Sequence, residues 1–414
     1  MNRIIPLAGE YEIIERSPSP QDIYCYSPGI LALPGGRLLA TMDFGGPGTK
    51  RLENSRQDPL YPNLYILGQV LISDDGGKSW KVTARFPFYH ARPFLCGNSI
   101  YILGHCGDLR IIRSDDQGES WSDVSVLTQG QLWHQAPSNV WYANNSVYLV
   151  MERITKYDTG WPVHSIAPVL MRGRIGENLL LRENWVFASE LTCSQAVEED
   201  KLEYHGIQFY DSKIEGGKYA QPLGWLEAQV IQFLDPDDIF TDPEGHTFHL
   251  FLRTNSGIPN MGAMLKVHES ADGAMTTSMV QTPSGKKLLF LPIPGGHLKF
   301  HILWDAVSGY YWLVSNQCTD GLKRYDSMPQ KRGDPINERH RLALYFSKNA
   351  FDWCFAGIVA LTEDENISRS YASMDIDGND LVIASRSGDI YAKNSHDTNL
   401  ITFHRIQKFR ELIY

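Results

Sequence analysis

The eight-residue segment Ser73–Trp80, SDDGGKSW, constrains the fold most, because the chain repeats it. A close copy, SDDQGESW, spans Ser114–Trp121, and an eroded version, SKNAFDW, spans Ser347–Trp353. A chemical site is rarely repeated within one chain, whereas a structural unit often is. Serine and aspartate can satisfy turn amides, and glycine can take left-handed backbone angles. A calcium loop is disfavoured because the further acids of an EF-hand are missing. The segment therefore predicts a turn in a repeat architecture.

The rest of the chain carries the pattern of many short antiparallel strands. Runs of Val, Ile, Leu, Tyr and Phe alternate with turns, and the chain has 35 glycines and 22 prolines. A unit of strand, turn and strand occurs six times. It appears as ILALPGGRLLATMD, PFLCGNSIYILGH, SNVWYANNSVYLVMER, QVIQFLDPDDIFTDPEGHTFHLFLR, KFHILWDAVSGYYWLVSNQ and ASMDIDGNDLVIASR.

Six such hairpins, most of them followed by further strands, predict an all-β fold: a six-bladed β-propeller of four-stranded antiparallel blades in one domain, 1–414. A two-sheet sandwich with helical insertions is the alternative. The expected blades span residues 17–87, 88–130, 131–190, 222–283, 285–362 and 366–414. The last unit is short of strands, and residues 10–16, EYEIIER, are expected to supply its outer strand.

The repeated Ser-x-Asp-x-Gly-x-Ser-Trp segment resembles the Asp-box, or BNR repeat, of the sialidase superfamily, whose members are six-bladed propellers. Through blade count and spacing, the resemblance covers essentially the whole chain. The Asp-box also occurs in proteins that are not enzymes. The resemblance therefore implies the fold more strongly than it implies an activity.

The charge pattern and the N-terminus limit partners and location. The net charge is -10, with acidic and basic residues interspersed, which disfavours nucleic acid. The first residues, MNRIIPLAGEYEII, lack the apolar core of a signal peptide, and no run reaches the roughly 18 apolar residues of a membrane span. Six scattered cysteines without a CxxC pair suggest free thiols. We expect a cytoplasmic protein, or a secreted one if a leader has been removed, without a membrane partner and of undetermined oligomeric state.

The hairpins offer a common spacing for locating the ligand-binding face. In a propeller, the starts of the first strands and the ends of the second strands share one face, where ligands usually bind. Each hairpin has a glycine or asparagine in its turn, and eight residues after it comes a polar or ionisable side chain. These are Asp43, His105, Arg153, Arg253, Gln317 and Arg386. Ordinary solvated strand ends are the alternative explanation.

The starts of the first strands add a second ring of polar side chains. They include Tyr26 and Ser27, His90 and Arg92, His134 and Gln135, Trp225 and Glu227, His297, Lys299 and His301, and Arg369 and Tyr371. In the segment HLKFH, 297–301, positions two apart would project to one side of a strand and suit an anionic ligand. A hydrogen-bonded core histidine beside a surface pair is the alternative.

The residue types in both rings favour a carboxylated sugar as the substrate. Arginine binds carboxylates in a bidentate way, and Trp133, Trp141 and Trp225 could stack on sugar rings. No HExxH spacing, P-loop, Rossmann fingerprint or GxSxG elbow is present, so no metal or cofactor is predicted.

Sialidases bind the substrate carboxylate with three arginines, and they use a tyrosine nucleophile paired with a glutamate and an aspartate as general acid/base. By this resemblance, Tyr371 is the expected nucleophile, Glu227 its partner and Asp43 the acid/base. A carboxylate that takes the phenol proton makes chemical sense, because the ordinary pKa of tyrosine is about 10. Arg253 and Arg386 match two of the three arginines. The family's Arg-Ile-Pro arginine is absent, since residues 26–29 read YSPG, which argues against a conventional sialidase.

Three functions remain after these arguments. The first is an exo-acting glycoside hydrolase that removes a terminal sugar from an acidic (uronic- or sialic-acid-type) glycan. The second is a uronide lyase that uses His90, His105, His134, His297 and Tyr371, and the third is a non-catalytic glycan-binding propeller. The expected catalytic residues are Asp43, His134, Glu227 and Tyr371. The expected substrate-binding residues are His90, Arg92, His105, Arg153, Arg253, His297, Lys299, His301, Gln317 and Arg386.

Overall fold

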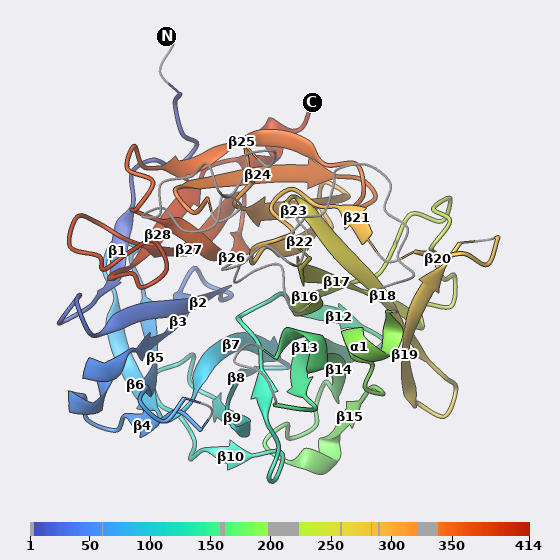
Figure 1. Ribbon diagram of the computed structural model, residues 1–414, viewed down its shortest axis with the longest axis horizontal. Coiled ribbons are helices and arrows are strands. Elements are labelled where there is room, and N and C mark those ends of the chain that lie inside the picture. Colours follow the sequence, from blue (N-terminus) through green and yellow to red (C-terminus); the bar gives the residue numbers. More distant parts are fainter. Residues whose placement is uncertain are drawn as a thin grey trace.

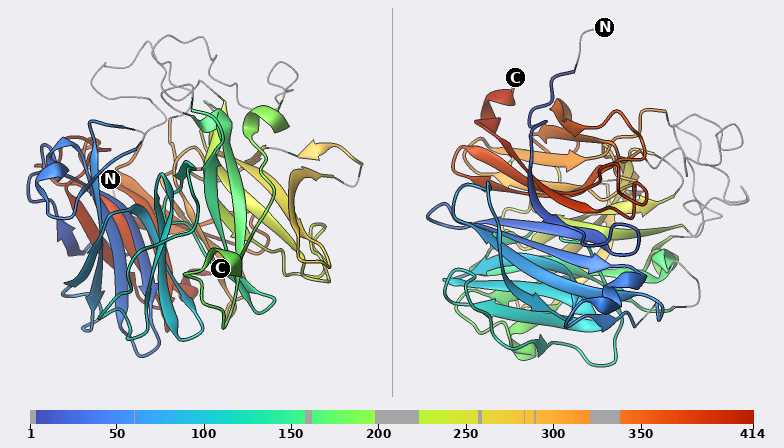
Figure 2. Two further views of the ribbon diagram at one scale, coloured as in Figure 1. Left: turned by 90° about the horizontal axis from the view of Figure 1, so that it is seen from below. Right: turned by 90° about the vertical axis from the view of Figure 1, so that its left-hand side faces the viewer.

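The computed structural model describes residues 4–59, 61–157, 162–197, 223–256, 259–282, 284–288, 290–320 and 338–414. These residues form six separate antiparallel sheets arranged in a ring around a central axis (Figure 1). The fold is therefore the predicted all-β six-bladed propeller, and the two-sheet sandwich is wrong. Seen from the side, the strands run between the two faces of the ring (Figure 2).

Each blade contains four to six strands. The first three blades comprise β2 (Tyr24–Ala32), β3 (Leu38–Gly45), β5 (Tyr65–Ser73), β6 (Lys81–Phe86) and the short β4 (Arg56–Gln57); then β7 (Tyr89–Cys96), β8 (Ser99–Cys106), β9 (Asp108–Ser114) and β10 (Ser125–Val126); then β11 (Trp133–His134), β12 (Trp141–Ala143), β13 (Ser146–Ile154), β14 (Ile166–Arg174) and β15 (Trp185–Phe187).

The last three blades comprise β16 (Gly224–Ile231), β17 (Thr247–Asn255), β18 (Met261–Glu269), β19 (Met275–Gln281), β20 (Lys287–Leu288) and β21 (Phe290–Pro292); then β22 (His301–Asp305), β23 (Tyr310–Ser315), β24 (Arg341–Ser347) and β25 (Cys354–Leu361); then β26 (Arg369–Asp377), β27 (Asp380–Ser387), β28 (Leu400–Ile406) and β1 (Glu12–Arg16).

The N-terminal segment closes the ring. β1 pairs antiparallel with β28, so that Glu12 lies opposite Phe403 and Arg16 opposite Leu400 (Figure 1). Just before β1, the amides of Leu7 and Ala8 donate hydrogen bonds to carbonyls of β25 in the fifth blade. The first residues thus join the fifth blade to the sixth, and closure leaves few unpaired sheet edges.

The repeated segments form the turns between the third and fourth strands of their blades. The Asp75 carboxylate accepts hydrogen bonds from the Ser79 amide and hydroxyl at 2.9 and 2.6 Å, and these bonds hold the pKa of Asp75 well below its ordinary value. The Trp80 indole donates to the Gly77 carbonyl at 3.0 Å. In the second copy, Asp116 and Ser120 repeat the arrangement.

A related turn joins β18 to β19, and the search for repeats within the sequence missed it. The Ser270 hydroxyl donates to the Asp272 carboxylate at 2.5 Å, and Gly273 has a left-handed backbone with φ of 83°. Its sequence, SADGAM, lacks the final Ser-Trp that made the other copies visible. The turn is therefore a structural repeat of the blades rather than a reactive loop.

The apolar core lies between neighbouring blades, in clusters that follow the ring. Phe88 packs between the first and second blades, Trp185 between the second and third, and Trp312 with Phe409 between the fifth and sixth. A fully buried aromatic or branched side chain of this kind contributes about 1.5–3 kcal/mol relative to an exposed one.

Helical structure is sparse in the described part of the chain. The α-helix α1 (Cys193–Ala196) has four residues, and no helix in the described ranges is long and apolar enough to cross a membrane. All six cysteines lie within those ranges, none of them forms a disulfide there, and five are buried.

Candidate functional site

On the face where the first strands begin, a pocket of about 430 Å³ opens near the central axis. Its described walls come from the first, second, third, fourth and sixth blades. Six of the fourteen predicted site residues line it: Asp43, His90, His134, Glu227, Tyr371 and Arg386. Two more, His105 and Arg253, lie directly behind and contact them.

Four of the inner strands are bulged at the same place, next to this pocket. The bulged residues have left-handed backbones, with φ of 49° at Ser27, 54° at His90, 56° at Glu227 and 52° at Tyr371. The pairing of first and second strands shifts register there. Such a conformation costs about 1–3 kcal/mol in a non-glycine residue, and it concentrates at functional sites. All four side chains line the pocket, so the repeated bulge serves to direct side chains into it.

The bulges also explain the eight-residue spacing found in the sequence. The residue just before each bulge pairs with the spaced residue on the second strand. The pairs are Tyr26 with Asp43, Tyr89 with His105, Leu226 with Arg253 and Ser370 with Arg386. The spacing therefore identified the strand positions that face the bulged residues.

Two residues with the same spacing turn away from the pocket. Arg153 pairs with Trp133 in the expected register, but its Nη1 donates hydrogen bonds to the carbonyls of Leu132 and Ile154. Gln317 is exposed, and its side-chain oxygen accepts a hydrogen bond from the Tyr345 hydroxyl at 2.6 Å. Neither lies among the described residues of the pocket wall.

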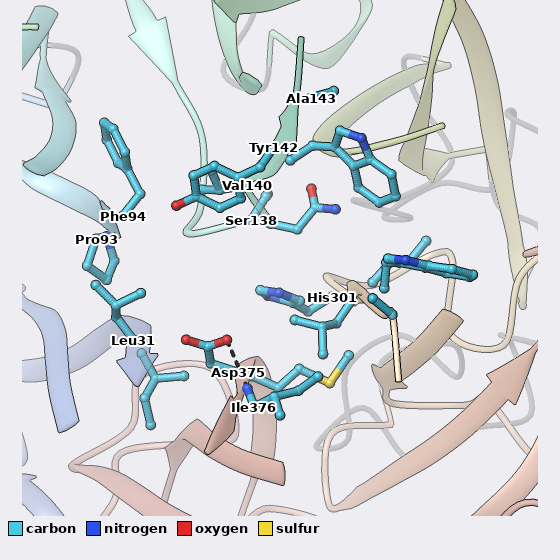
Figure 3. Close-up of a pocket in the computed structure, with 18 of the residues that line it drawn as sticks. Leu31, Pro93, Phe94, Ser138, Val140, Tyr142, Ala143, His301, Asp375 and Ile376 are labelled. Atoms are coloured by element: carbon cyan, nitrogen blue, oxygen red, sulfur yellow. Dashed lines mark hydrogen bonds between the residues drawn. The ribbon is translucent and has the colours of Figure 1, made fainter. Parts of the chain in front are cut away.

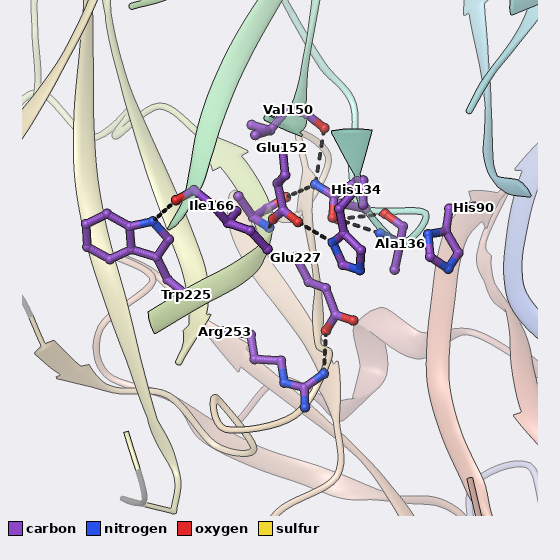
Figure 4. Close-up of polar contacts among 12 residues, drawn as sticks. His90, His134, Ala136, Val150, Glu152, Ile166, Trp225, Glu227 and Arg253 are labelled. Atoms are coloured by element: carbon purple, nitrogen blue, oxygen red, sulfur yellow. Dashed lines mark hydrogen bonds and ion pairs between the residues drawn. The ribbon is translucent and has the colours of Figure 1, made fainter. Parts of the chain in front are cut away.

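Tyr371, Glu227 and Arg253 form a hydrogen-bonded triad in the pocket. The Tyr371 hydroxyl donates to Glu227 Oε1 at 2.8 Å and accepts from Arg253 Nη1 at 2.7 Å. The same Nη1 donates to Glu227 Oε2 at 3.0 Å (Figure 4). Glu227 and Arg253 are only 3% and 4% exposed, so this ion pair is screened little by water.

The charges around the triad set its protonation. Burial raises the pKa of Glu227, but the attraction of Arg253 outweighs it and leaves that pKa below its ordinary value. Burial raises the pKa of the Tyr371 phenol, which Arg253 opposes. At rest, the site therefore holds a neutral phenol against an ionised carboxylate. That arrangement allows the phenol to lose its proton to Glu227 as it attacks an electrophilic carbon.

Three guanidinium groups surround the Tyr371 ring. The central carbons of Arg386, Arg339 and Arg253 lie 3.8, 5.2 and 6.0 Å from the ring centroid. Arg386 is 3% exposed, and its Nε and Nη2 have no hydrogen-bond partner in the described part of the chain. A buried guanidinium without a counter-ion is costly, and a bound anion would relieve that cost.

The sequence reasoning missed Arg339, which lies just before the third strand of the fifth blade. The eight-residue spacing locates only second strands. The local sequence ERHR, 338–341, was the available signal, because four ionisable residues lie at the start of an otherwise apolar strand.

A second buried carboxylate, Glu152, was also missed. Its Oε2 lies 2.7 Å from His134 Nδ1, and its Oε1 accepts a hydrogen bond from the Ala228 amide at 3.1 Å (Figure 4). Burial raises the pKa of Glu152, opposed by its hydrogen bond to His134. A carboxylate at Nδ1 favours the tautomer with the proton there, so Nε2 can accept a proton from a ligand. Glu152 directly precedes Arg153, so the eight-residue spacing selected Arg153 and missed the carboxylate beside it.

The remaining histidines of the pocket are packed together. His90 Nδ1 lies 3.0 Å from His105 Nε2, and the ring centroids of His90 and His134 are 5.4 Å apart. Burial, reinforced by the neighbouring histidines, holds the pKa of His90 and of His105 well below the ordinary value. The residues that the structure describes contain no group of three or more His, Cys, Asp or Glu side chains placed to hold a metal ion.

Asp43 lies beneath these histidines. Its Oδ1 accepts a hydrogen bond from the His90 amide at 3.1 Å, and the side chain is 1% exposed. Burial raises the pKa of Asp43 to about 7, although the hydrogen bond from the His90 amide opposes the change. The carboxyl is therefore about half protonated at neutral pH, as a group that both donates and accepts protons requires.

The expected alternation in the segment HLKFH is wrong. β22 begins only at His301, and residues 297–300 form a turn and an irregular segment, so the period of a strand does not apply. His297 Nδ1 accepts a hydrogen bond from the Asn260 amide at 3.0 Å, and its carbonyl accepts one from Arg253 Nε. Lys299 Nζ donates to the Ala372 carbonyl and the Ser373 hydroxyl.

Arg92 and His301 also lie outside the described pocket wall. Arg92 is buried inside the ring, where its Nη2 donates to the Val150 carbonyl at 2.9 Å. His301 lines a different pocket, on the opposite face. Trp133 and Trp225 are 2% and 1% exposed and belong to the core rather than to a sugar-stacking surface.

The rim of the pocket contains residues that the sequence reasoning did not select. The Tyr26 hydroxyl donates to Asp397 at 2.7 Å, and Lys393 Nζ donates to the Tyr24 hydroxyl at 2.6 Å. His396 Nδ1 lies 2.8 Å from Asp397, and the His396 side chain is 49% exposed. The three residues of the β27–β28 loop thus bring further polar groups to the pocket.

Comparison with other proteins identifies the fold. No protein-family model matches the chain, and no curated protein sequence matches it. Trypanosoma rangeli sialidase in complex with sialic acid aligns with a TM-score of 0.55 and 14% identity, over 99% of this chain and 60% of that chain. A Dyadobacter fermentans protein of unknown function aligns with a TM-score of 0.56 and 13% identity, over 97% and 98% of the two chains.

The GH93 α-L-arabinofuranosidase of Fusarium graminearum, in complex with arabinobiose, aligns with a TM-score of 0.50 and 11% identity, over 97% and 98% of the chains. This chain spans only 60% of the sialidase chain. At such identities the similarity concerns the fold. The chain therefore shares a sialidase-like six-bladed propeller with proteins that include glycoside hydrolases.

Proposed function

We propose that this protein is an exo-acting glycoside hydrolase that removes a terminal carboxylated sugar from an acidic glycan or oligosaccharide. The observation that carries the proposal is the buried triad in which the Tyr371 hydroxyl lies 2.8 Å from Glu227 and 2.7 Å from Arg253. A phenol held between a carboxylate and a guanidinium is suited to nucleophilic attack, and the folds of sialidase and of GH93 arabinofuranosidase support a glycosidase.

The first step forms a glycosyl-enzyme intermediate. Tyr371 Oη attacks the anomeric carbon as its proton passes to Glu227, and a C–O bond forms to the tyrosine. The glycosidic C–O bond breaks, and the leaving oxygen takes its proton from the neutral Asp43 carboxyl, whose pKa is about 7. The product alcohol then leaves.

The second step releases the sugar. A water molecule loses its proton to Asp43 as its oxygen attacks the anomeric carbon. The bond to Tyr371 Oη breaks, and Glu227 returns the proton to the phenolate. Asp43 and Glu227 thereby regain their starting protonation, and the net reaction is hydrolysis.

The carboxylate of the substrate is bound by arginine in this proposal. Arg386 lines the pocket with two nitrogens that lack partners in the described ranges, and Arg253 and Arg339 lie beside the same tyrosine ring. Arg386 belongs to the sixth blade, which neighbours the first blade, where residues 26–29 lack the sialidase Arg-Ile-Pro motif. Because Arg339 joins Arg253 beside the ring, we propose that these two fill the two matched arginine positions. Arg386, which the sequence had matched to one of them, instead takes the role of the missing arginine.

A substrate panel tests the proposal. Purified protein is incubated with 4-methylumbelliferyl glycosides of N-acetylneuraminic, glucuronic and galacturonic acids, and of neutral arabinofuranose and glucose. We expect fluorescence from at least one acidic glycoside and none from the neutral ones. Cleavage of a neutral glycoside alone would overturn the acidic substrate class. Binding of an acidic oligosaccharide without any cleavage would replace the enzyme with a glycan-binding module.

A trapping experiment tests the nucleophile. A derivative of the cleaved acidic sugar, with fluoride as the leaving group on the anomeric carbon and a second fluorine on the adjacent carbon, should form a stable adduct on Tyr371 as fluoride leaves. The adduct is detected as a mass increase of the intact protein and mapped to the peptide that contains Tyr371. An adduct on Glu227 or Glu152 would contradict the tyrosine mechanism while leaving hydrolysis intact.

One observation favours a second candidate, a uronide lyase. His134 is oriented by Glu152 at 2.7 Å and is 19% exposed in the pocket, as a base that removes the C5 proton of a uronide would be. Elimination creates an unsaturated product that absorbs near roughly 235 nm. A gain of absorbance at that wavelength, without water incorporation, would select the lyase, and products without it would select hydrolysis.

A further inference from the structure

A second pocket opens at the other end of the central axis. It has a volume of about 590 Å³, and its lining includes residues near the ends of β2, β7 and β26 and the first residues of β22 (Figure 3). Its volume falls within the range of pockets that hold small molecules. Nothing in the proposed hydrolysis uses it.

The second pocket contains one acidic side chain, Asp375, and no basic one among the described residues that line it except the histidine His301. The Asp375 carboxylate points into the cavity (Figure 3). Its Oδ2 accepts a hydrogen bond from the Ala32 amide, and its Oδ1 accepts one from the Ile376 amide, both at 2.8 Å. Each carboxylate oxygen can accept two hydrogen bonds, so acceptor capacity remains on both.

Within the described residues, no lysine or arginine pairs with Asp375. Burial raises its pKa to about 6, against the two amide bonds. The carboxylate is therefore ionised at neutral pH in a partly buried place without a counter-ion. Such a charge is strongly stabilised by a cation that enters the cavity.

His301 adds no positive charge beside it. Burial, reinforced by the nearby Lys299 and Arg92, holds the pKa of His301 well below its ordinary value, so the ring is neutral. The side chain is 5% exposed, and its Nδ1 has no partner in the described ranges. His301 and Asp375 both line the cavity (Figure 3).

Aromatic rings form much of the wall opposite Asp375. The polar ends of two of them are already engaged, because the Tyr142 hydroxyl donates to the Leu95 carbonyl and the Trp141 indole donates to Gln232, both at 2.9 Å. Tyr142 is 50% exposed, and Trp304 also lines the pocket. Tyr142 and Trp304 therefore offer ring surface to the cavity, whereas Trp141 is 7% exposed and belongs to the apolar core.

We propose that the second pocket binds a small organic cation, a protonated amine carried on an aromatic or alkyl body. The ammonium group pairs with Asp375, and the body packs on Tyr142 and Trp304, since aromatic rings attract cations as well as apolar groups. An anion would be repelled by Asp375, and a neutral sugar would leave the carboxylate unpaired. The proposal does not depend on the hydrolase function.

Three probes of one shape test the charge requirement. Binding of benzylamine, benzyl alcohol and benzoate to the purified full chain is measured at pH 7.5 by isothermal titration calorimetry. Benzylamine should bind at least tenfold more tightly than benzyl alcohol, and benzoate should not bind. Equal affinities for the amine and the alcohol would overturn the proposal.

Two matched variants test the location. Asp375→Asn should weaken benzylamine at least tenfold. Asp377→Asn removes the same charge two residues away on the same strand, where Asp377 pairs with Arg405 outside the pocket, and should keep the wild-type affinity. Unchanged benzylamine binding by Asp375→Asn would overturn the assignment.

The wild-type protein provides a test that needs no variant. Because the carboxylate must be ionised, benzylamine affinity should fall about tenfold between pH 7.5 and pH 5, across the Asp375 pKa of about 6. The ionisable groups that face Asp375 are Asp377 on its own strand, Tyr142 on β12 and His301 on β22. The pKa of Tyr142 is raised and that of His301 is lowered, so neither titrates in this interval. A pH-independent affinity would contradict ion pairing.

Discussion

The two faces of the ring are built by the same inner strands, but they differ in charge and in backbone regularity. At the starts of the strands, four residues have left-handed backbones, and arginines surround Tyr371. At the ends, no described lining residue other than glycine has a positive φ, and the one unpaired charge is the Asp375 carboxylate. One scaffold thus presents a strained, cation-rich pocket on one face and a regular, anionic one on the other. The pocket proposed for catalysis is therefore distinguished by the left-handed residues in its strands, because the fold itself is the same at both ends.

The largest effect is expected when the proposed nucleophile is removed from the first pocket. Tyr371→Phe keeps the ring but loses the hydroxyl that bonds to Glu227 and Arg253, so kcat on the acidic glycoside should fall about 10³-fold or more. Tyr345→Phe removes a hydroxyl that bonds only to Gln317 in the described structure and serves as the control. A Tyr371→Phe enzyme with near-normal kcat would refute the tyrosine mechanism. Steady-state kinetics and circular dichroism check both variants.

The next largest effect concerns the cationic character of the first pocket. Arg386→Met should raise KM for the acidic glycoside about 30- to 1,000-fold, because the substrate carboxylate loses a charged partner. Thermal stability should stay equal or increase, since the variant removes a buried charge without a partner in the described ranges. Arg153→Met, at the same spacing but turned to main-chain carbonyls, should leave KM unchanged. A rise of KM in both variants would mean that the effect is structural.

The Glu152–His134 pair separates the two candidate reactions at the first pocket. Glu152→Gln removes the negative charge that orients His134, 2.7 Å away. If Tyr371 and Asp43 perform hydrolysis, kcat should fall only about tenfold. If His134 is the base of an elimination, the loss should reach about 10²–10⁴-fold. Initial rates, followed by fluorescence and at roughly 235 nm, distinguish the two.

The pH profile gives a smaller and independent test. Asp43 must be protonated to donate to the leaving oxygen, and its pKa is about 7, so kcat/KM should decrease about tenfold per pH unit above that value. Glu227 must be ionised, and its pKa lies below the ordinary value, so the acidic limb should lie well below the alkaline one. Asp43→Asn should lose the alkaline limb. Its persistence in that variant would assign the proton donor elsewhere.

The smallest effect is on stability. The Asp43 carboxyl binds its proton more tightly in the folded chain, with a pKa of about 7, than in an unfolded chain, where it is about 3.9. The stabilisation from its raised pKa is complete below about pH 4 and is lost as pH rises through 7. Asp43→Asn should therefore raise Tm more at pH 8 than at pH 5, as measured by calorimetry. An equal change at both pH values would show that the group is not buried and neutral.

The fold could be predicted because its signals are periodic and local. The turn sequence and the hairpins each depend on residues close in the chain, and strand register then determined which positions reach the pocket face, as for Asp43 and Arg253. Register does not determine the direction of a long side chain, which is why Arg153 and Gln317 lie outside the pocket.

The rest of the site depends on contacts between blades, which no local pattern reveals. Arg339 approaches Tyr371 from the fifth blade, and Glu152 contacts the Ala228 amide of the fourth. The error at 297–301 had a different cause: the apolar residues of HLKFH imitate a strand that begins only at its last residue. The left-handed bulges were also not predictable, because non-glycine residues adopt them only when the surrounding pairing enforces them.

The pairing of β1 with β28 has a consequence for how the molecule is made. During synthesis, β1 leaves the ribosome before the other strands of the six blades, yet its partner β28 (Leu400–Ile406) follows all of them. The ring can therefore close only after β28 has been synthesised, and until then the edge of β1 lacks its partner. A contact between the two ends of a chain is slow to form. Both pockets are lined by residues of the first and sixth blades, so neither pocket is complete before β1 and β28 pair.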